Sequence, residues 1–335
     1  MMRLPKFNHI SPRTIEEACV LREKYGLEAS ILAGGTDLLV ACKLRIQQPS
    51  YLISLREIQE LKGITYKEDE GLRIGAMSSL DEIRSDPTVL KHYPGLSEAA
   101  STVGTPQLRE MGTLGGNLCL NTRCIYFNQS DTWRKSRAIC FKMGGDVCHV
   151  VPKGRKCFAV FSGDMAPILI ALHAKIKLVS TSGERLVPVE NLYSGDGKEP
   201  IALKSGELLA EIILPRLVER QRSIYLKYKV RGAIDFPLTG VAVRMDSNGT
   251  GICMDCRVVL NAVGSSPVGV PEAEELMRGK VPNAELIDQI SQKAMERAHP
   301  VANTSGSTPN YRRKMVGLLT KRALLAVANN LSMIR

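Results

Sequence analysis

The chain has 335 residues, more than the ~250–300 at which a single hydrophobic core stops growing, so we expect two or three domains. A hydrophobic content of 44% and a charged content of 24% are ordinary for a water-soluble globular protein. No apolar run approaches the ~18 residues of a membrane helix, and the N-terminal residues lack the apolar stretch of a secretion signal. These features predict a cytoplasmic protein that does not span a membrane.

The first 56 residues are predicted to form a small α/β lobe. The expected elements are a helix over 14–25, a strand over 29–32, a helix over 38–44 and a strand over 51–53. A glycine turn at 33–37 separates the first strand from the second helix. A strand, a turn, a helix and a strand in this order predict a βαβ crossover with parallel pairing.

Two further units are predicted after this lobe. Residues 57–218 form a larger mixed lobe, and residues 219–335 form a C-terminal domain with an antiparallel sheet and helices. The expected strands cover 63–66, 72–75, 175–179, 208–214, 225–230, 240–245 and 251–260, and the expected helices cover 80–84, 89–101, 271–277, 284–298 and 310–330. The fold class is therefore α+β.

Two glycine-rich loops are candidate ligand loops. The first, residues 33–37, joins a predicted strand to a helix, where adjacent glycines let a phosphate approach the backbone and Thr36 or Asp37 can cap the helix. The second, residues 113–117, again pairs glycines with a hydroxyl and an amide. Neither loop matches a Rossmann or Walker fingerprint, so plain turns are an alternative for both. Asp164 can accept hydrogen bonds from ribose hydroxyls or cap the helix that follows it.

Four cysteines lie within 34 residues, between the second glycine loop and Asp164. Cys124, Cys140, Cys148 and Cys157 have the spacing C-x15-C-x7-C-x8-C, which matches neither paired zinc knuckles nor bacterial ferredoxin runs. Four thiolates suit zinc or an iron–sulfur cluster, and a neighbouring flavin favours the cluster because zinc has no redox role. In a chain without an export signal, metal binding is favoured over disulfides.

The segment from residue 122 to 161, called the insert below, is strongly basic. It holds eight basic and two acidic residues, which account for +6 of the net charge of +11. Such a surface attracts acidic partners. Nucleic-acid binding is a weaker alternative, since aromatic residues make up only 5% of the chain and no long Lys/Arg tract occurs. We expect Trp133 to pack over the cysteines, and Cys119, Cys253 and Cys256 to be buried thiols, the last two on opposite faces of a strand.

Taken in order, these motifs resemble the FAD-binding medium subunits of the xanthine dehydrogenase and molybdenum hydroxylase family. The resemblance rests on residues 31–38, 113–117 and 163–167, on Lys227 within 225–231, and on the arginine-containing closing helix. It implies a PCMH-type FAD-binding domain followed by a C-terminal flavoprotein domain. It also implies that FAD binds at Ile31, Leu32, Ala33, Gly34, Gly35, Thr36, Asp37, Leu38, Val103, Thr113, Leu114, Gly115, Gly116, Asn117, Asp164, Leu209 and Lys227.

The insert is similar to that of the 4-hydroxybenzoyl-CoA reductase β subunits within this family. That resemblance implies a 4Fe–4S cluster on the four cysteines and an electron-transfer subunit without substrate-transforming residues of its own. Electrons would pass from reduced ferredoxin, an acidic donor, through 4Fe–4S and FAD to a 2Fe–2S small subunit and a molybdenum large subunit that dehydroxylates an aromatic acyl-CoA. A dimer of heterotrimers is expected.

Two alternatives remain open. A hydroxylase medium subunit would keep the fold and pass electrons outward through FAD. A zinc-stapled basic module that binds nucleic acid or another protein would not be an enzyme.

Overall fold

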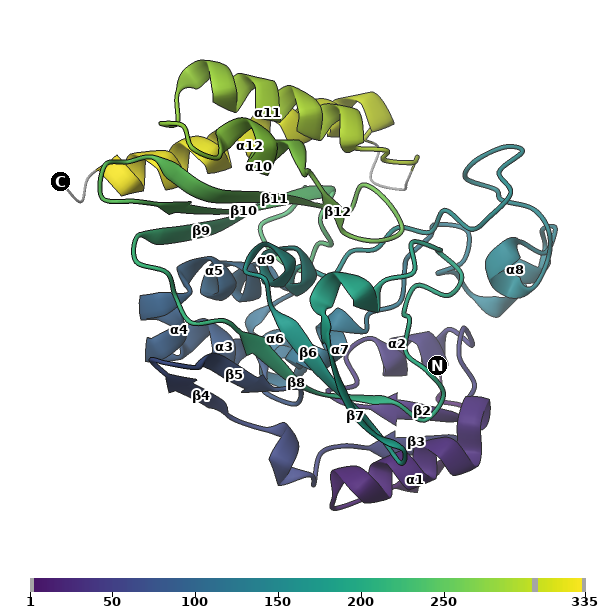
Figure 1. Cartoon of the computed structure of the whole chain (residues 1–335). Helices are drawn as coiled ribbons and strands as arrows, with labels where there is room; N and C mark the ends of the chain where they lie inside the picture. The colour runs from purple at the N-terminus through teal and green to yellow at the C-terminus, as the bar shows by residue number, and fades with distance from the viewer. Residues whose placement is uncertain (1–2, 303–306, 333–335) are drawn as a thin grey trace.

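Three sheets organise the computed structural model of the chain, which describes residues 3–302 and 307–332 (Figure 1). Met1 and Met2 of the N-terminal stretch considered above lie outside the described residues. The strands alternate with helices in the first half of the chain, and the helices are gathered at the C-terminal end in the second half. The α+β class predicted from the sequence is confirmed.

The first sheet is parallel and belongs to the N-terminal residues. Its strands are β1 (Asn8–Ile10), β3 (Tyr51–Ser54) and β2 (Ala29–Leu32), in that order, and its helices are α1 (Ile15–Tyr25) and α2 (Leu38–Lys43). The hydroxyl of Thr14 accepts a hydrogen bond from the amide of Glu17 at 3.1 Å, which fixes the start of α1. β2 and β3 pair in parallel across α2, so the predicted βαβ crossover is confirmed.

The second sheet has five antiparallel strands. In order they are β4 (Ile64–Lys67), β5 (Gly71–Gly75), β8 (Leu208–Leu214), β6 (Lys175–Ser180) and β7 (Gly183–Pro188). The helices between these strands include α3 (Leu80–Ser85), α4 (Pro87–His92), α5 (Pro94–Thr102), α6 (Pro106–Met111), α7 (Leu114–Leu118) and α9 (Met165–Ala171). The single helix predicted over 89–101 is wrong, because Pro94 lacks an N–H donor and starts a new helix.

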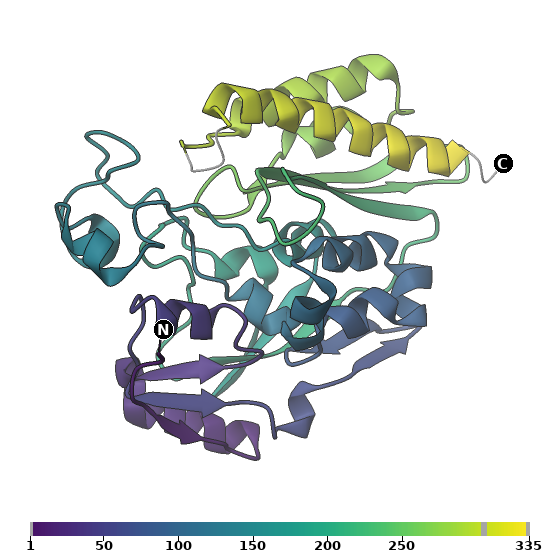
Figure 2. The ribbon, with the colours of Figure 1, turned by 180° about the vertical axis from the view of Figure 1, so that it is seen from behind.

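The third sheet is antiparallel and carries the C-terminal helices on one face, as Figure 2 shows from behind. Its strands are β12 (Val268–Gly269), β11 (Cys253–Asn261), β10 (Thr239–Ser247) and β9 (Gln221–Tyr228), and its helices are α10 (Glu272–Met277), α11 (Ala284–Arg297) and α12 (Pro309–Ser332). Alternate residues of β10 enter different cores: Ala242 packs with α9, whereas Val241 and Val243 pack with α11 and α12. Every residue of α9 is buried, so this helix lies between the second and third sheets.

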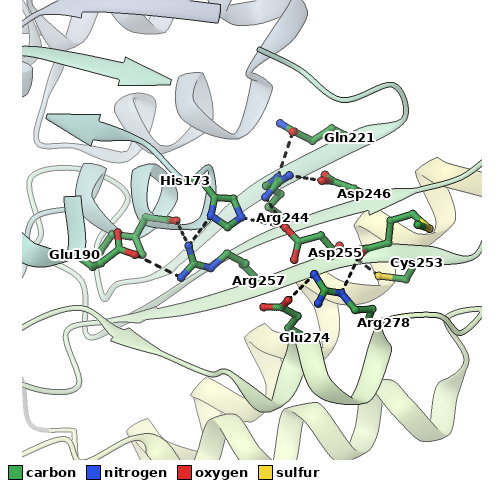
Figure 3. Close-up of polar contacts among 12 residues, drawn as sticks. His173, Glu190, Gln221, Arg244, Asp246, Cys253, Asp255, Arg257, Glu274 and Arg278 are labelled. Carbon is green, nitrogen blue, oxygen red and sulfur yellow. Dashed lines mark hydrogen bonds and ion pairs between the residues drawn. The ribbon is translucent and has the colours of Figure 1, made fainter. Parts of the chain in front are cut away.

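A charged network joins the end of α9 to the outer residues of the third sheet (Figure 3). His173 lies 3.0 Å from a carboxylate oxygen of Asp255, and the same oxygen accepts from Arg244 at 2.7 Å. Arg244 also pairs with Asp246. Hydrogen bonding to His173 is the main reason that the pKa of Asp255 falls to about 2, whereas burial raises the pKa of Asp246 to about 6. The network lies at the C-terminal end of α9, whereas Asp164 lies at its N-terminal end.

No helix within the two described ranges, 3–302 and 307–332, is both long enough and apolar enough to cross a membrane.

Candidate functional site

The two glycine loops, far apart in sequence, lie directly against each other. A side chain at Gly34 would collide with the carbonyl oxygen of Met111, immediately before the second loop. Gly35 has a φ of 72°, a conformation that favours glycine. Both glycines of the first loop are therefore required by backbone packing and backbone conformation, whether or not a phosphate approaches them. Asp37 begins α2, but its side chain makes no capping hydrogen bond.

The second glycine loop is the start of a short helix. Thr113 precedes α7 and its hydroxyl accepts from the amide of Gly116 at 3.1 Å. A side chain at Gly115 would lie 2.8 Å from the Cβ atom of Ala76, so this glycine allows α7 to pack against the second sheet. The side-chain oxygen of Asn117 accepts from the amide of Met165 at 3.1 Å. The loop thus connects the first glycine loop to the residues that follow Asp164.

Asp164 and Lys227 form a buried ion pair, with the ammonium nitrogen 2.8 Å from the carboxylate. Lys227 also donates to the carbonyl oxygen of Thr102 at 2.9 Å, next to the half-buried Val103. Burial raises the pKa of Asp164, and the charge of Lys227 and a hydrogen bond from Tyr225 oppose that shift. Asp164 makes no capping hydrogen bond to α9, so the capping role considered from the sequence is wrong.

Two residues that sequence reasoning missed complete this pair. The hydroxyl of Tyr225 donates to Asp164 at 2.7 Å, and the amide of Asn261 donates to that hydroxyl at 2.9 Å and to the carbonyl of Gly163 at 3.1 Å. Tyr225 lies two residues before Lys227 on β9 and so shares its face, a periodicity that the sequence contains. Asn261 carries no comparable signal. Leu209 is buried on β8, a strand against which α7 packs.

The insert leaves and rejoins the body at one point. Arg123 and Val160 exchange two backbone hydrogen bonds of 2.8 Å, and between them the chain projects from the body with α8 (Asp131–Lys135) at its outer part (Figures 1 and 2). The small closed base means that the insert is a distinct structural unit.

The four predicted cysteine ligands gather inside this unit. The charges of Cys157 and Cys140 raise the pKa of Cys124, and those of Cys148 and Cys140 raise the pKa of Cys157, in both cases after burial as the larger cause. All four thiols are free and lie partly or fully out of solvent. The four cysteines therefore lie in one region of the insert, near enough for their charges to interact, and their role as metal ligands stays a prediction.

Backbone amides point at three of these sulfur atoms. The amide of Val151 donates to the sulfur of Cys148 at 3.4 Å. Hydrogen bonds from the amides of Tyr126 and Phe127 lower the pKa of Cys124, and one from Ala159 lowers the pKa of Cys157. Such bonds stabilise thiolates, and hydrogen bonds to sulfur tune iron–sulfur clusters. Neutral thiols would be stabilised less than thiolates by these amide hydrogen bonds.

Lys142 is a positively charged residue near the cysteines Cys124, Cys140 and Cys157; these four residues and Cys148 are called the cysteine pocket below. Its ammonium donates to the carbonyl of Gly197 at 2.5 Å, to Asn121 at 2.8 Å and to the hydroxyl of Thr122. These partners are all neutral. Burial lowers the pKa of Lys142 to about 8, while the charges of Cys157, Cys124, Asp196 and Cys140 act in the opposite direction. A half-buried ammonium without a bonded carboxylate fits a pocket whose occupant is negatively charged.

The arrangement of the cysteines bears on the kind of metal group. Across residues 3–302 and 307–332, no three His, Cys, Asp or Glu side chains converge as ligands of one metal ion. A tetrahedral zinc site needs four sulfur atoms at about 2.3 Å from a single ion. A 4Fe–4S cluster places one thiolate on each of four irons, so its ligands lie farther apart. The described residues therefore present no site for a single metal ion of this kind.

The remaining sequence predictions have mixed outcomes. Trp133 lies beside the ring of Tyr126, and its predicted packing over the cysteines stays a prediction. Burial raises the pKa of Cys119 to about 12. Cys253 and Cys256 are both buried in the core beneath α11 and α12, so the prediction of opposite faces is wrong. The register between β10 and β11 shifts at Asp246, which breaks the strand alternation.

The fold and the paired loops match known proteins over nearly the whole chain. A solved structure of carbon monoxide dehydrogenase from Hydrogenophaga pseudoflava contains a chain that superposes with a TM-score of 0.79 at 28% identity, covering 98% of this chain and 99% of that one. The curated medium chain of that enzyme is 28% identical over 322 residues, which are 96% of this chain and 97% of the relative. The aldehyde oxidoreductase FAD-binding subunit of Escherichia coli is 30% identical, covering 89% of this chain and 90% of the relative.

Family comparison agrees with these relatives. The family described as the FAD binding domain in molybdopterin dehydrogenase matches residues 5–217, and the CO dehydrogenase flavoprotein C-terminal domain matches residues 224–327. The chain therefore belongs to the FAD-binding medium subunits of the xanthine dehydrogenase and carbon monoxide dehydrogenase family, and it is a flavoprotein subunit of an oxidoreductase.

Proposed function

We propose that this chain is the electron-transfer subunit of a molybdenum-containing reductase of the 4-hydroxybenzoyl-CoA reductase type. It would hold FAD at the paired glycine loops and a 4Fe–4S cluster on Cys124, Cys140, Cys148 and Cys157. The two groups would carry electrons from reduced ferredoxin toward 2Fe–2S centres and a molybdenum subunit that dehydroxylates an aromatic acyl-CoA.

The observation that carries this proposal is that three of the four cysteines, Cys124, Cys140 and Cys157, lie near Lys142, and that the fourth, Cys148, lies near Cys157. The hydrogen-bond partners of the Lys142 ammonium are all neutral, so its positive charge is not used by a bonded carboxylate. A cluster with four thiolates is an anion, and Lys142 supplies the nearby positive charge that such a buried anion requires. The amides that point at Cys124, Cys148 and Cys157 support the same occupant.

The flavin part of the proposal rests on chain contacts around the glycine loops. Gly34 lies against Met111, just before residues 113–117, Ala33 lies near Gly116, and Asn117 connects the second loop to the segment that contains Asp164. Amides of both loops would face the pyrophosphate, while Lys227 would provide a fixed positive charge near the isoalloxazine ring. Val103 and Leu209 would contribute apolar surface.

The partners follow from charge and from the family. The basic insert favours an acidic donor such as ferredoxin, because complementary charge speeds encounter. A molybdenum large subunit and a 2Fe–2S small subunit would complete a heterotrimer, and two heterotrimers would form the complex. The names of the relatives as medium chains of dehydrogenases support a multi-subunit assembly.

Anaerobic purification tests the proposal directly. Iron, zinc and flavin assays on one sample, together with low-temperature EPR, should give about four irons and one FAD per chain and a reducible cluster signal. Flavin without iron would exclude the cluster and reduce the assignment to an ordinary hydroxylase subunit. Zinc without flavin would refute both cofactor assignments.

A second candidate keeps FAD and reverses the electron flow. It is favoured by the relatives themselves, which include dehydrogenases named for carbon monoxide and nicotinate. In that case electrons from substrate oxidation would leave through FAD to an acceptor. Rapid reoxidation of the reduced complex by NAD⁺, with no reduction by ferredoxin, would establish this direction.

A further inference from the structure

The insert contacts the body at several points, among them Gly197 and both ends of the short helix α2. The N-terminal end of α2 is the first glycine loop, and its C-terminal end is the turn at Leu44 and Arg45. Two arginines of the insert reach these two ends.

Arg123 holds the first end. It directly precedes Cys124, and its guanidinium pairs with the carboxylate of Asp37 in the first glycine loop. The same guanidinium lies 4.2 Å from the ring centre of Phe236, which belongs to the segment between β9 and β10. One side chain therefore contacts the glycine loop, the base of the insert and the C-terminal domain.

Arg134 holds the second end. Its side chain is only 5% exposed, and it donates to the carbonyl oxygens of Leu44 at 3.2 Å and Arg45 at 2.9 Å. The last carbonyls of a helix have no partner within the helix, and a cation there also interacts favourably with the helix dipole. A third bond, to Gln129 at 2.5 Å, ties the same guanidinium to the insert. Arginine suits this position because its planar fork serves several acceptors at once.

We propose that Arg123 and Arg134 are positioning residues for electron transfer: they clamp α2 at both ends and so fix the cysteine pocket relative to the first glycine loop. This inference rests on the proposed function for its electron-transfer role. The clamp itself consists of contacts within the chain and does not depend on any cofactor. Transfer between two centres depends on their separation and orientation, which a loosely attached insert would not hold constant.

The test uses Arg123→Gln and Arg134→Lys in the complete complex, with Arg137→Gln as the matched control. Arg137 lies in the same insert, but its guanidinium stacks on Trp133 at 4.3 Å and makes no bond to α2. The complex is reduced by a flash-generated deazaflavin radical, and the internal re-equilibration between cluster and flavin is followed by absorbance. Hydrogen exchange of residues 38–47 is measured in parallel.

Both clamp variants should keep their iron and FAD while internal transfer slows severalfold and residues 38–47 exchange faster. The double variant should be slower than either single variant, and Arg137→Gln should match the unmodified protein. Unchanged transfer in both clamp variants would overturn the inference. If Arg134→Lys loses iron, Arg123→Gln alone decides. If the unmodified protein holds no iron, the proposed function fails, and unchanged exchange of residues 38–47 would overturn the clamp as well.

Discussion

The glycine loops and the cysteine insert adjoin the same helix, but they are held by different forces. The loops meet through backbone, at a point where Gly34 leaves no room for a side chain against Met111. The insert is attached through charged side chains, chiefly Arg123, Arg134 and Lys142. Close packing of backbones is disrupted by added volume, whereas an ion pair or charged hydrogen bond is disrupted when either partner is removed. The first region should therefore fail when volume changes, and the second when charge changes.

The largest expected effect is the loss of one cofactor from the insert while the other stays bound at the glycine loops. Cys140→Ser should abolish the iron and the EPR signal, because it removes one of the four proposed ligands, while FAD should stay bound at the glycine loops. Iron and flavin assays on the purified variant measure this. An iron content equal to that of the unmodified protein would contradict the ligand assignment, and loss of both cofactors would show that the regions are not independent.

Gly34→Ala should damage the loop region and spare the cysteines. The added methyl group meets backbone, which cannot move aside as a side chain can, so we expect a cost of about 3 kcal/mol and weakened FAD binding. Chemical denaturation and flavin titration measure the two effects. Gly249→Ala is the control, since open space surrounds Gly249, and its stability should change by less than about 0.5 kcal/mol. A neutral Gly34→Ala variant would refute the packing argument.

The network around Arg244 is a third region, in which charged contacts stabilise the fold and hold no proposed cofactor. Asp255 has a pKa of about 2 in the folded chain, below its unfolded value, so its stabilisation is complete above about pH 4 and disappears as the pH falls toward 2. Asp255→Asn should therefore cost about 2 kcal/mol at pH 7, and the cost should shrink steadily as the pH falls from about 4 to 2.

Asp246→Asn is the opposite control for this prediction. Its folded pKa of about 6 is raised, so ionisation of Asp246 costs stability as the pH rises from about 4 to 6. Removing that charge should not reproduce the loss seen for Asp255→Asn. Urea denaturation of both variants across this pH range compares them. A pH-independent loss in Asp255→Asn would exclude a charge effect.

The smallest expected effect concerns charge without ligand loss. Lys142→Gln should keep the iron but lower the midpoint potential of the cluster, because a nearby positive charge favours the more negative reduced state. Redox titration followed by EPR measures the potential. Lys153→Gln removes the same charge from an exposed position of the insert and should leave the potential almost unchanged. Equal shifts in both variants would indicate a general charge effect of the insert.

Much of the fold could be predicted from local sequence, and the failures have physical causes. The βαβ crossover, the hairpin of β4 and β5 and the C-terminal sheet follow from hydrophobic periodicity. The break at Pro94 was a readable signal, as was Thr105-Pro106, which begins the unpredicted helix α6. β7 is half-exposed and polar, so its strand character depends on pairing with β6. The boundaries near residues 56 and 218 stay a prediction.

The site was predicted in composition more than in arrangement. The four cysteines, Asp164 and Lys227 were each named from sequence, but the ion pair between Asp164 and Lys227 was not predicted. The clamp by Arg123 and Arg134 was not predictable, because it joins residues nearly ninety positions apart through backbone carbonyls that no residue type reveals. The requirement for glycine at position 34 was also not predictable, because it depends on the backbone of Met111, a neighbour in space and not in sequence.

The closed base of the insert has a consequence for how the insert relates to the body. Since Arg123 and Val160 are hydrogen-bonded neighbours, the intervening segment can be removed, and the body closed by a tight turn, without moving either flanking strand of chain. The insert therefore behaves as a side loop of the chain, whose two ends share one paired backbone position on the body.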